Sequence, residues 1–245
     1  MKTGKRFVTV MAVAVVAMGM MTANAQTVWN VNIGGEDLTG YQGAATNNNP
    51  VSGSTWNAVT TYASTTLNDS SGDNTAGVTI SMAHAVGAGD PDVADIHFGT
   101  QSQTTGDPIF KSYMKDDNNA DAVTVTFGGL SAAATYDLVV YSGWRFGPEA
   151  LQVEQSAGTG LDGIFIINSR KMQDGHPLST GLAEDTNAAD VAGDFNYARF
   201  NGLTADSGNL AFDFFVGGDR DAPICGFQLV EFPPAATPGT LIYGK

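Results

Sequence analysis

Cysteine occurs once in the 245 residues, at Cys225. A single cysteine cannot form an intramolecular disulfide, although small exported domains often rely on such bonds. Its neighbours in Pro-Ile-Cys-Gly-Phe are apolar, so we expect a buried, inert thiol rather than a nucleophile. Stability must therefore come from a packed core, which a chain of this length is large enough to build.

Long apolar runs are also missing after the first 25 residues. The first 25 residues contain the basic residues Lys2, Lys5 and Arg6, then an apolar run over 7–21, and then the small-residue sequence Ala23-Asn24-Ala25. This is the layout of a secretory signal peptide cleaved after Ala25. We therefore expect an exported protein, secreted or on the cell surface, with the periplasm as a further location. We also expect no membrane span in the mature chain.

Basic residues are few: eleven Lys and Arg stand against 25 Asp and Glu, and the formal net charge is −14. Removal of residues 1–25 takes away three basic and no acidic residues, so the net charge becomes −17 and eight basic residues remain. The sequence therefore predicts no nucleic-acid binding by phosphate neutralisation, and no attraction to anionic membranes. Such acidity is typical of a protein that stays soluble outside the cell.

Recognisable catalytic groups are scarce as well. The three histidines, His84, His97 and His176, are far apart and show no zinc-ligand spacing. The chain has no Gly-x-Ser-x-Gly motif, and only five glutamates. Paired carboxylates of a glycoside hydrolase meet in space rather than in sequence, and Glu149 and Glu154 are the nearest candidates. We expect no catalytic residues, while the question of an enzyme stays open.

Alternation of apolar and polar residues dominates the rest of the chain. In residues 27–33, one face holds Trp29, Val31 and Ile33, and the other holds Asn30 and Asn32. We assign Trp29 to the core. Similar segments are 77–84, 122–127, 135–142, 209–216 and 223–232, whereas 163–168 is continuously apolar, as in a strand covered on both sides. Clusters of Gly, Asn and Asp between them favour turns. The pattern predicts an all-β antiparallel sandwich of jelly-roll type.

Three segments depart from this alternation. Residues 106–117 predict one short helix, since Asp107 is a good N-cap and Pro108 suits the first helical position. Residues 169–194 form a long polar segment that predicts a loop. Residues 233–245 are rich in proline and predict a linker or tail. We therefore expect a single domain over 26–232.

Two segments repeat one pattern, in which a strand leads to Gly-Leu, a small or polar turn and a second strand. They are VTVTFGGLSAAATYDLVVY and ARFNGLTADSGNLAFDFFV. We interpret them as two hairpin-like corners of similar chemistry rather than as a duplication.

These segments, together with STWNAV, LNDSSGDNTAGVTISM and APICGFQLVE, resemble a group of secreted bacterial proteins with a galactose-binding-like β-sandwich domain. The resemblance covers most of 28–232, and the closing Gly-Phe-Gln-Leu-Val strand is its most distinctive part. Many members end in Pro-Glu-Pro, an apolar helix and a basic end, whereas this sequence ends in PGTLIYGK. The resemblance implies a fold shared by sugar-binding modules, accessory domains of glycan-degrading enzymes and adhesion domains, and no single activity.

The candidate ligand-binding residues are aromatic residues near strand ends. Trp144 and Arg145 follow the strand expected over 135–142, at the rim where binding loops gather. A sugar could stack on Trp144 and bond to Arg145, with Tyr141 beside them; in the alternative, the indole fills the end of the core. Trp56 is a further candidate, with a structural alternative in which Trp-Asn forms a corner and Asn57 satisfies a turn.

The acidic clusters of the sequence are candidate ligands for a structural calcium ion, the one cofactor that the sequence suggests. Calcium binds six to eight oxygen atoms, and such loops can supply them. Turn formation explains the same residues, and no cluster has EF-hand spacing. The sequence does not choose among Asp69/Asp73, Asp90/Asp92/Asp95, Asp116/Asp117/Asp121 and Asp219/Asp221.

The expected function is that of a secreted, non-catalytic β-sandwich that binds carbohydrate or contributes to an extracellular matrix. One alternative is a structural or adhesion protein that associates with itself or with a protein partner. A second alternative is a polysaccharide hydrolase or lyase.

Overall fold

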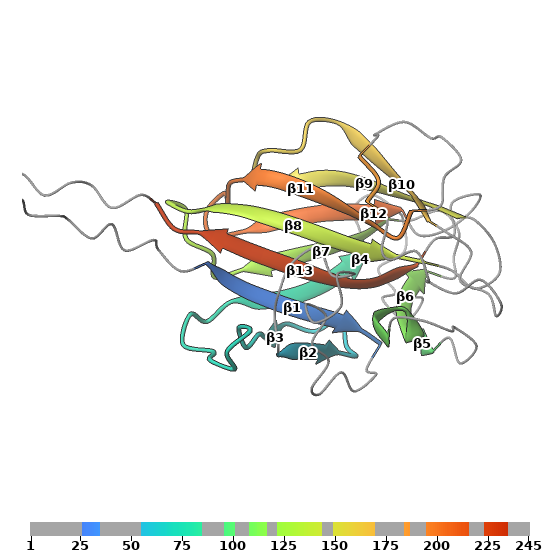
Figure 1. Ribbon diagram of the computed structural model, residues 1–245, viewed down its shortest axis with the longest axis horizontal. Coiled ribbons are helices and arrows are strands. Elements are labelled where there is room, and N and C mark those ends of the chain that lie inside the picture. Colours follow the sequence, from blue (N-terminus) through green and yellow to red (C-terminus); the bar gives the residue numbers. More distant parts are fainter. Residues whose placement is uncertain are drawn as a thin grey trace, which may run out of the picture.

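The computed structural model confirms the all-β sandwich. It describes residues 26–34, 55–84, 96–100, 108–116, 122–143, 149–169, 184–186, 195–215 and 223–234. Two sheets pack face to face, and the described residues contain no α-helix (Figure 1). Within the described residues, no helix is long and apolar enough to cross a membrane. Several predictions fall outside the described residues. They concern the signal peptide (1–25), most of the loop over 169–194 with His176, most of the tail over 233–245, and most of the acidic clusters.

The first sheet has seven strands and carries the candidate site. Its main order is β11-β8-β13-β1-β2, β6 pairs with β13, and β5 pairs with β6. β1 runs parallel to β2 and antiparallel to β13. The strands are β1 (Thr27–Ile33), β2 (Trp56–Val59), β5 (Ile96–Thr100), β6 (Ser112–Asp116), β8 (Thr135–Ser142), β11 (Tyr197–Leu203) and β13 (Ile224–Phe232).

The second sheet has six strands in the order β10-β9-β12-β7-β4-β3. They are β3 (Thr65–Thr66), β4 (Thr79–His84), β7 (Ala122–Gly128), β9 (Glu149–Ala157), β10 (Ile164–Ser169) and β12 (Leu210–Phe215). The alternating segments of the sequence therefore all form strands, with ends within two residues of the expected ones. The period of two places each apolar set on one face, and burying that face fixes the register.

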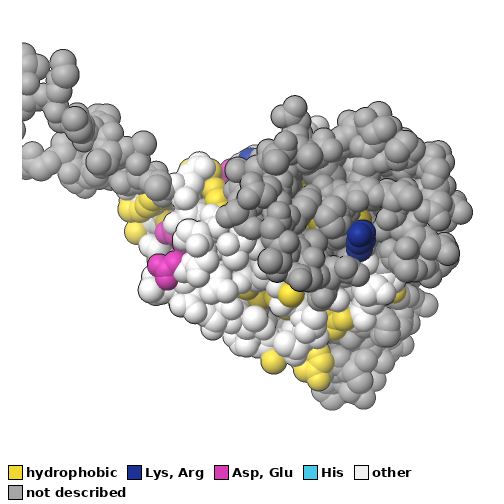
Figure 2. Space-filling model, turned by 60° about the horizontal axis from the view of Figure 1, so that its bottom comes forward, with side chains coloured by type: hydrophobic (Ala, Val, Ile, Leu, Met, Phe, Trp, Pro, Cys, Tyr) yellow, Lys and Arg dark blue, Asp and Glu magenta, His cyan; other side chains and the backbone are white. Residues whose placement is uncertain are grey.

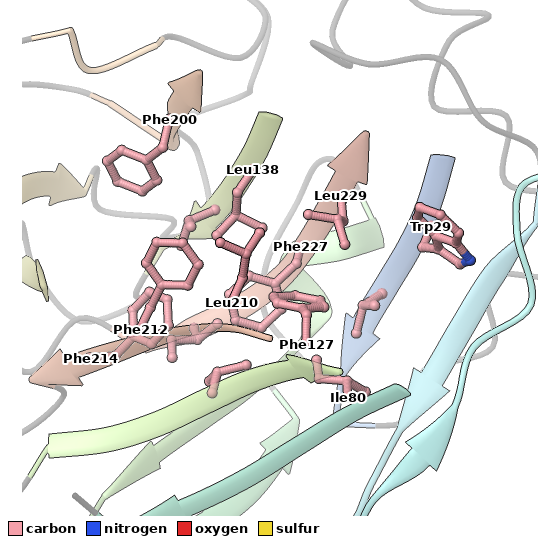
Figure 3. Close-up of a cluster of buried hydrophobic side chains, with 14 of the residues drawn as sticks. Trp29, Ile80, Phe127, Leu138, Phe200, Leu210, Phe212, Phe214, Phe227 and Leu229 are labelled. Atoms are coloured by element: carbon pink, nitrogen blue, oxygen red, sulfur yellow. The ribbon is translucent and has the colours of Figure 1, made fainter. Parts of the chain in front are cut away.

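The core lies between the sheets and is rich in phenylalanine (Figure 3). Phe227 of β13 meets Phe127 of β7 edge to face, with ring centroids 5.7 Å apart, and lies 5.6 Å from the ring of Phe214 of β12. These contacts join the two sheets by the geometries that aromatic pairs prefer. Trp29 is also buried here, as the sequence predicts.

The prediction of a helix over residues 106–117 is wrong. Residues 108–111 form the 3-10 helix η2 (Pro108–Lys111), and strand β6 begins directly after it. Met114 pairs with Phe98 of β5 and with Ile224 of β13 and lies in the core, so pairing with two strands overrides the local helical pattern. Ile109 and Phe110 are buried on the opposite side of the first sheet.

Strand β10 agrees only in part with the prediction that its apolar run is covered on both sides, because Ile166 and Ile167 are buried on opposite faces whereas Ile164 is exposed. It is an end strand of the second sheet, and its Ile164 side chain is 50% exposed. Ile167 is buried in the core, whereas Ile164 lies on the opposite face, beside Glu154 of β9. A continuous apolar run therefore does not distinguish a central strand from an end strand.

The two similar Gly-Leu segments are arches between the sheets rather than hairpins. One connects β7 to β8 and the other connects β11 to β12, and each crosses from one sheet to the other. Gly129 and Gly202 adopt positive φ angles of 75° and 69°, and the leucine after each is buried. The arches lie together, because the Leu130 amide donates to the Gly208 carbonyl at 3.0 Å. Gly129 permits the turn of the first arch, whereas Gly202 lies at the register shift near the end of β11, and the buried leucine anchors each segment.

Tyr136 closes the first arch. Its hydroxyl accepts a hydrogen bond from the Ser131 amide at 2.7 Å and donates one to the Ser131 carbonyl. Burial, with Glu231 as the second cause, raises the pKa of Tyr136 to about 12, so the hydroxyl stays protonated. We expect Tyr136→Phe to lower the free energy of unfolding by about 1–2 kcal/mol. Urea unfolding measures the loss, and the exposed Tyr62→Phe is the control. Equal stability of the two variants would contradict this role.

Candidate functional site

Two of the four predicted ligand-binding residues meet on the outer face of the first sheet, the face turned away from the second sheet. Trp56 and Tyr141 are 85 positions apart in the sequence, yet their ring centroids are 6.4 Å apart with an interplanar angle of 59°. Trp144 and Arg145 lie outside the described residues, so their predicted role stays a prediction. The site below is therefore built around Trp56 and Tyr141.

The strand registers explain how these two rings reach the same face. On β8, Tyr136 and Leu138 point into the core, so Tyr141 points outward with Val139. Trp56 is the first residue of β2 and pairs with Asn30 of β1, whose side chain also points outward. Strands β13 and β1 lie between β8 and β2, so the two large rings reach toward each other across them.

Tyr141 is the centre of an outer aromatic cluster, which consists of Trp56, Phe110, Tyr141 and Tyr197. Its ring centroid lies 6.2 Å from that of Phe110 and 6.1 Å from that of Tyr197. Phe110 and Tyr141 are fully buried, and Tyr197 is 9% exposed, whereas Trp56 is only half-buried. Trp56 is therefore the ring of this cluster with the most surface left for a ligand.

A hydrogen-bonded chain of side chains runs beneath the outer aromatic cluster. The Tyr141 hydroxyl donates to Gln228 Oε1, and Gln228 Nε2 donates to Asn30 Oδ1 at 2.6 Å. Asn30 Nδ2 in turn donates to the Thr55 carbonyl at 2.9 Å. Asn30, Gln228 and Tyr141 have no exposed surface, so these polar groups depend on one another for their hydrogen bonds.

Asn57 holds the other side of Trp56, as the sequence predicts for a Trp-Asn corner. Its Nδ2 donates to the carbonyls of Asn30 and Asn68, at 2.9 and 2.7 Å. Its Oδ1 accepts from the Asn68 amide at 2.8 Å. The residues on both sides of Trp56 are thus tied to the fold, Thr55 through its carbonyl and Asn57 through its side chain, so the indole starts from a fixed backbone.

Tyr197 borders the site on the side of β11. Its hydroxyl donates to Glu184 Oε2 at 3.3 Å. Burial, followed by the negative charge of Glu184, raises the pKa of Tyr197 to about 12. The hydroxyl therefore remains a neutral donor at any physiological pH, and Tyr197 contributes an apolar ring rather than a charge to the face.

Cys225 lies under the same face and is buried, as predicted. It has no exposed surface, and burial raises the pKa of its thiol to about 12. The thiol donates to the Gly143 carbonyl at 3.5 Å, and Gly143 directly precedes Trp144. A buried thiol with a raised pKa is mostly protonated near neutral pH, which makes it a poor nucleophile.

The Asp69/Asp73 cluster is organised as a turn. Asp69 Oδ1 accepts from the amides of Ser71 and Asp73 and from the Ser71 hydroxyl. Asp73 accepts from the amide and hydroxyl of Thr75. Burial would raise the pKa of the Asp69 carboxyl, but the hydrogen bonds outweigh it and hold the pKa below its ordinary value. Among the described residues, no three His, Cys, Asp or Glu side chains gather as metal ligands would.

We expect Asp69→Ala to lower the free energy of unfolding by about 1 kcal/mol at pH 7, because the turn loses its acceptor. Asp69→Asn keeps an acceptor oxygen and should retain most of the stability. Since the folded-state pKa is lowered, the carboxylate stabilises the protein above that range and the contribution disappears as the pH falls through it. The difference between the native protein and Asp69→Asn should therefore vanish in acid. Urea titrations at several pH values test this, and a larger difference at low pH would contradict it.

Sequence reasoning missed Asn30, Gln228 and Tyr197 as members of the site. Their positions on the outward faces of β1, β13 and β11 mark them as surface residues, and nothing in the alternation indicates that they are buried. No protein-family model, curated protein or solved structure matches this chain.

Proposed function

We propose that this protein is an exported, non-catalytic binding protein that holds a neutral polysaccharide against Trp56 on the outer face of the first sheet. The observation that carries the proposal is the half-buried indole of Trp56, fixed at both neighbouring residues and packed against Tyr141. A pre-fixed aromatic ring loses little conformational freedom when a sugar ring stacks on it, which favours binding.

The charge around Trp56 favours a neutral polymer. Strands β1 (TVWNVNI) and β2 (WNAV) contain no charged residue. The described part of the surface in Figure 2 is mostly uncharged, with few acidic and basic side chains. The formal net charge, −14 for the whole sequence and −17 without residues 1–25, opposes the approach of anionic polymers. Export is inferred from residues 1–25 and belongs to the same proposal.

A retention experiment tests this function. The purified chain without residues 1–25 is mixed with insoluble neutral polysaccharides, such as cellulose and chitin, and with anionic ones, such as alginate and pectate gels. We expect retention on at least one neutral polymer, and this retention should depend only weakly on salt. We expect no retention on the anionic gels. Parallel samples with calcium and with chelator reveal any dependence on a metal ion. Absence of retention on every neutral polymer would contradict the proposal and would favour the self-associating structural protein, which sedimentation velocity detects.

A further inference from the structure

We infer that Gln228 is a positioning residue for Trp56, acting through a polar relay that consists of Tyr141, Gln228, Asn30 and the Thr55 carbonyl. The inference rests on the proposed function, since it says how the ligand-contacting ring is oriented. The relay residues Tyr141, Gln228 and Asn30 are fully buried, so they act on a ligand through Trp56 rather than by contact.

The relay follows the order of the strands in the sheet. Tyr141 lies on β8, Gln228 on β13 and Asn30 on β1, and Thr55 directly precedes β2. Gln228 and Asn30 are paired directly across β13 and β1. Tyr141 lies two positions beyond Val139, the register partner of Gln228 on β8, which is a diagonal that a long side chain spans. The relay therefore connects four neighbouring segments at right angles to the strands.

The Thr55 carbonyl sets the direction of every bond in the relay. A carbonyl only accepts, so Asn30 must turn its Nδ2 toward Thr55 and its Oδ1 toward Gln228. Gln228 must then present Nε2 to Asn30 and Oε1 to Tyr141, whose hydroxyl becomes a donor. One orientation of two amides and one hydroxyl satisfies all three bonds, so the relay holds Thr55, and with it the start of β2, in a single arrangement.

Trp56 is coupled to both ends of the relay. Its backbone follows Thr55, whose carbonyl ends the relay, and its ring packs on Tyr141, whose hydroxyl begins it. Loss of the Tyr141 hydroxyl therefore acts on Trp56 from two sides: the ring of Tyr141 is no longer held by Gln228, and the relay loses the bond that ties Gln228 to β8.

Tyr141→Phe tests the relay, and Tyr136→Phe is a matched control. Both tyrosines lie on β8, both are at most 1% exposed, and each variant removes only a bonded hydroxyl, on opposite faces of the sheet. The readouts are the indole N–H signal of Trp56 in a 1H–15N spectrum without polysaccharide, and the affinity for the retained neutral polymer. Trp56→Phe identifies the Trp56 signal.

We expect both variants to lose similar stability, but only Tyr141→Phe to move the Trp56 signal and to weaken affinity by roughly threefold or more. Gln228→Met, which removes the bonds of Gln228 to Tyr141 and to Asn30, should move the same signal. An unchanged Trp56 signal in Tyr141→Phe, or an equal change in Tyr136→Phe, would overturn the relay. If no polysaccharide is retained by the native protein, the proposed function fails, while the Trp56 signal still decides the relay.

Discussion

Asn30→Asp is expected to destabilise the protein by about 3 kcal/mol or more at pH 7. The two side chains have the same shape, but the atom that faces the Thr55 carbonyl changes from an N–H donor to an oxygen. The Asn30 side chain has no exposed surface, and its other atom accepts from Gln228. The variant must therefore either bury a carboxylate against a carbonyl oxygen or bind a proton at neutral pH.

The pH dependence of this variant has a definite sign. A carboxyl that is buried against a carbonyl oxygen has a raised pKa, and in its protonated form it can donate to the Thr55 carbonyl. A group with a raised folded-state pKa supports the fold below its unfolded-state pKa, and this support disappears as the pH rises. The deficit of Asn30→Asp should accordingly shrink as the pH falls. Urea unfolding at pH 7 and in mild acid measures it.

Asn74→Asp is the matched control for Asn30→Asp, because it adds the same charge at an exposed position in a turn. We expect Asn74→Asp to lie within about 0.5 kcal/mol of the native protein. If Asn30→Asp unfolds at the same urea concentration as Asn74→Asp, the buried relay does not have the bonding described here.

Trp56→Ala is expected to reduce retention on the neutral polymer at least tenfold, since a single aromatic anchor commonly supplies more than 1.4 kcal/mol of binding free energy. Because Trp56 is half-buried and its neighbours keep their own bonds, the loss of stability should stay below that of a fully buried tryptophan. Affinity electrophoresis or depletion isotherms measure the retention.

Tyr62→Ala is the control for Trp56→Ala. Tyr62 is a 43% exposed aromatic residue outside the outer aromatic cluster, so its removal tests whether any surface ring supports retention. We expect Tyr62→Ala to bind like the native protein. Equal retention by Trp56→Ala and the native protein would remove Trp56 from the site.

The strand pattern was predictable because one buried face imposes a period of two on most segments, as in residues 27–33 and 135–142. The segment 106–117 was mispredicted because Pro108 and its neighbours do suit a helix locally, while β5 and β13 supply the pairing that makes Ser112–Asp116 a strand. Neighbouring strands in space are invisible to a local pattern, and the end position of β10 was missed for the same reason.

The candidate site was only half predictable. Trp56 and Tyr141 stand out as aromatic residues near strand ends, but their contact depends on the order β8-β13-β1-β2, which joins distant segments. Asn30 and Gln228 have the pattern of surface residues, yet both are fully buried on the outer face, where Phe110 of η2 packs against Tyr141. The local sequence around a polar residue on the outward face of a strand does not indicate whether other side chains cover that face.

The indole N–H signal of Trp56, followed during titration with a soluble oligosaccharide of the retained neutral polymer, tests the central claim most directly. The account predicts that this signal shifts and saturates with the oligosaccharide, while the signal of the core residue Trp29 stays in place. An oligosaccharide that binds without moving the Trp56 signal, or a spectrum that no neutral oligosaccharide changes, would contradict the account.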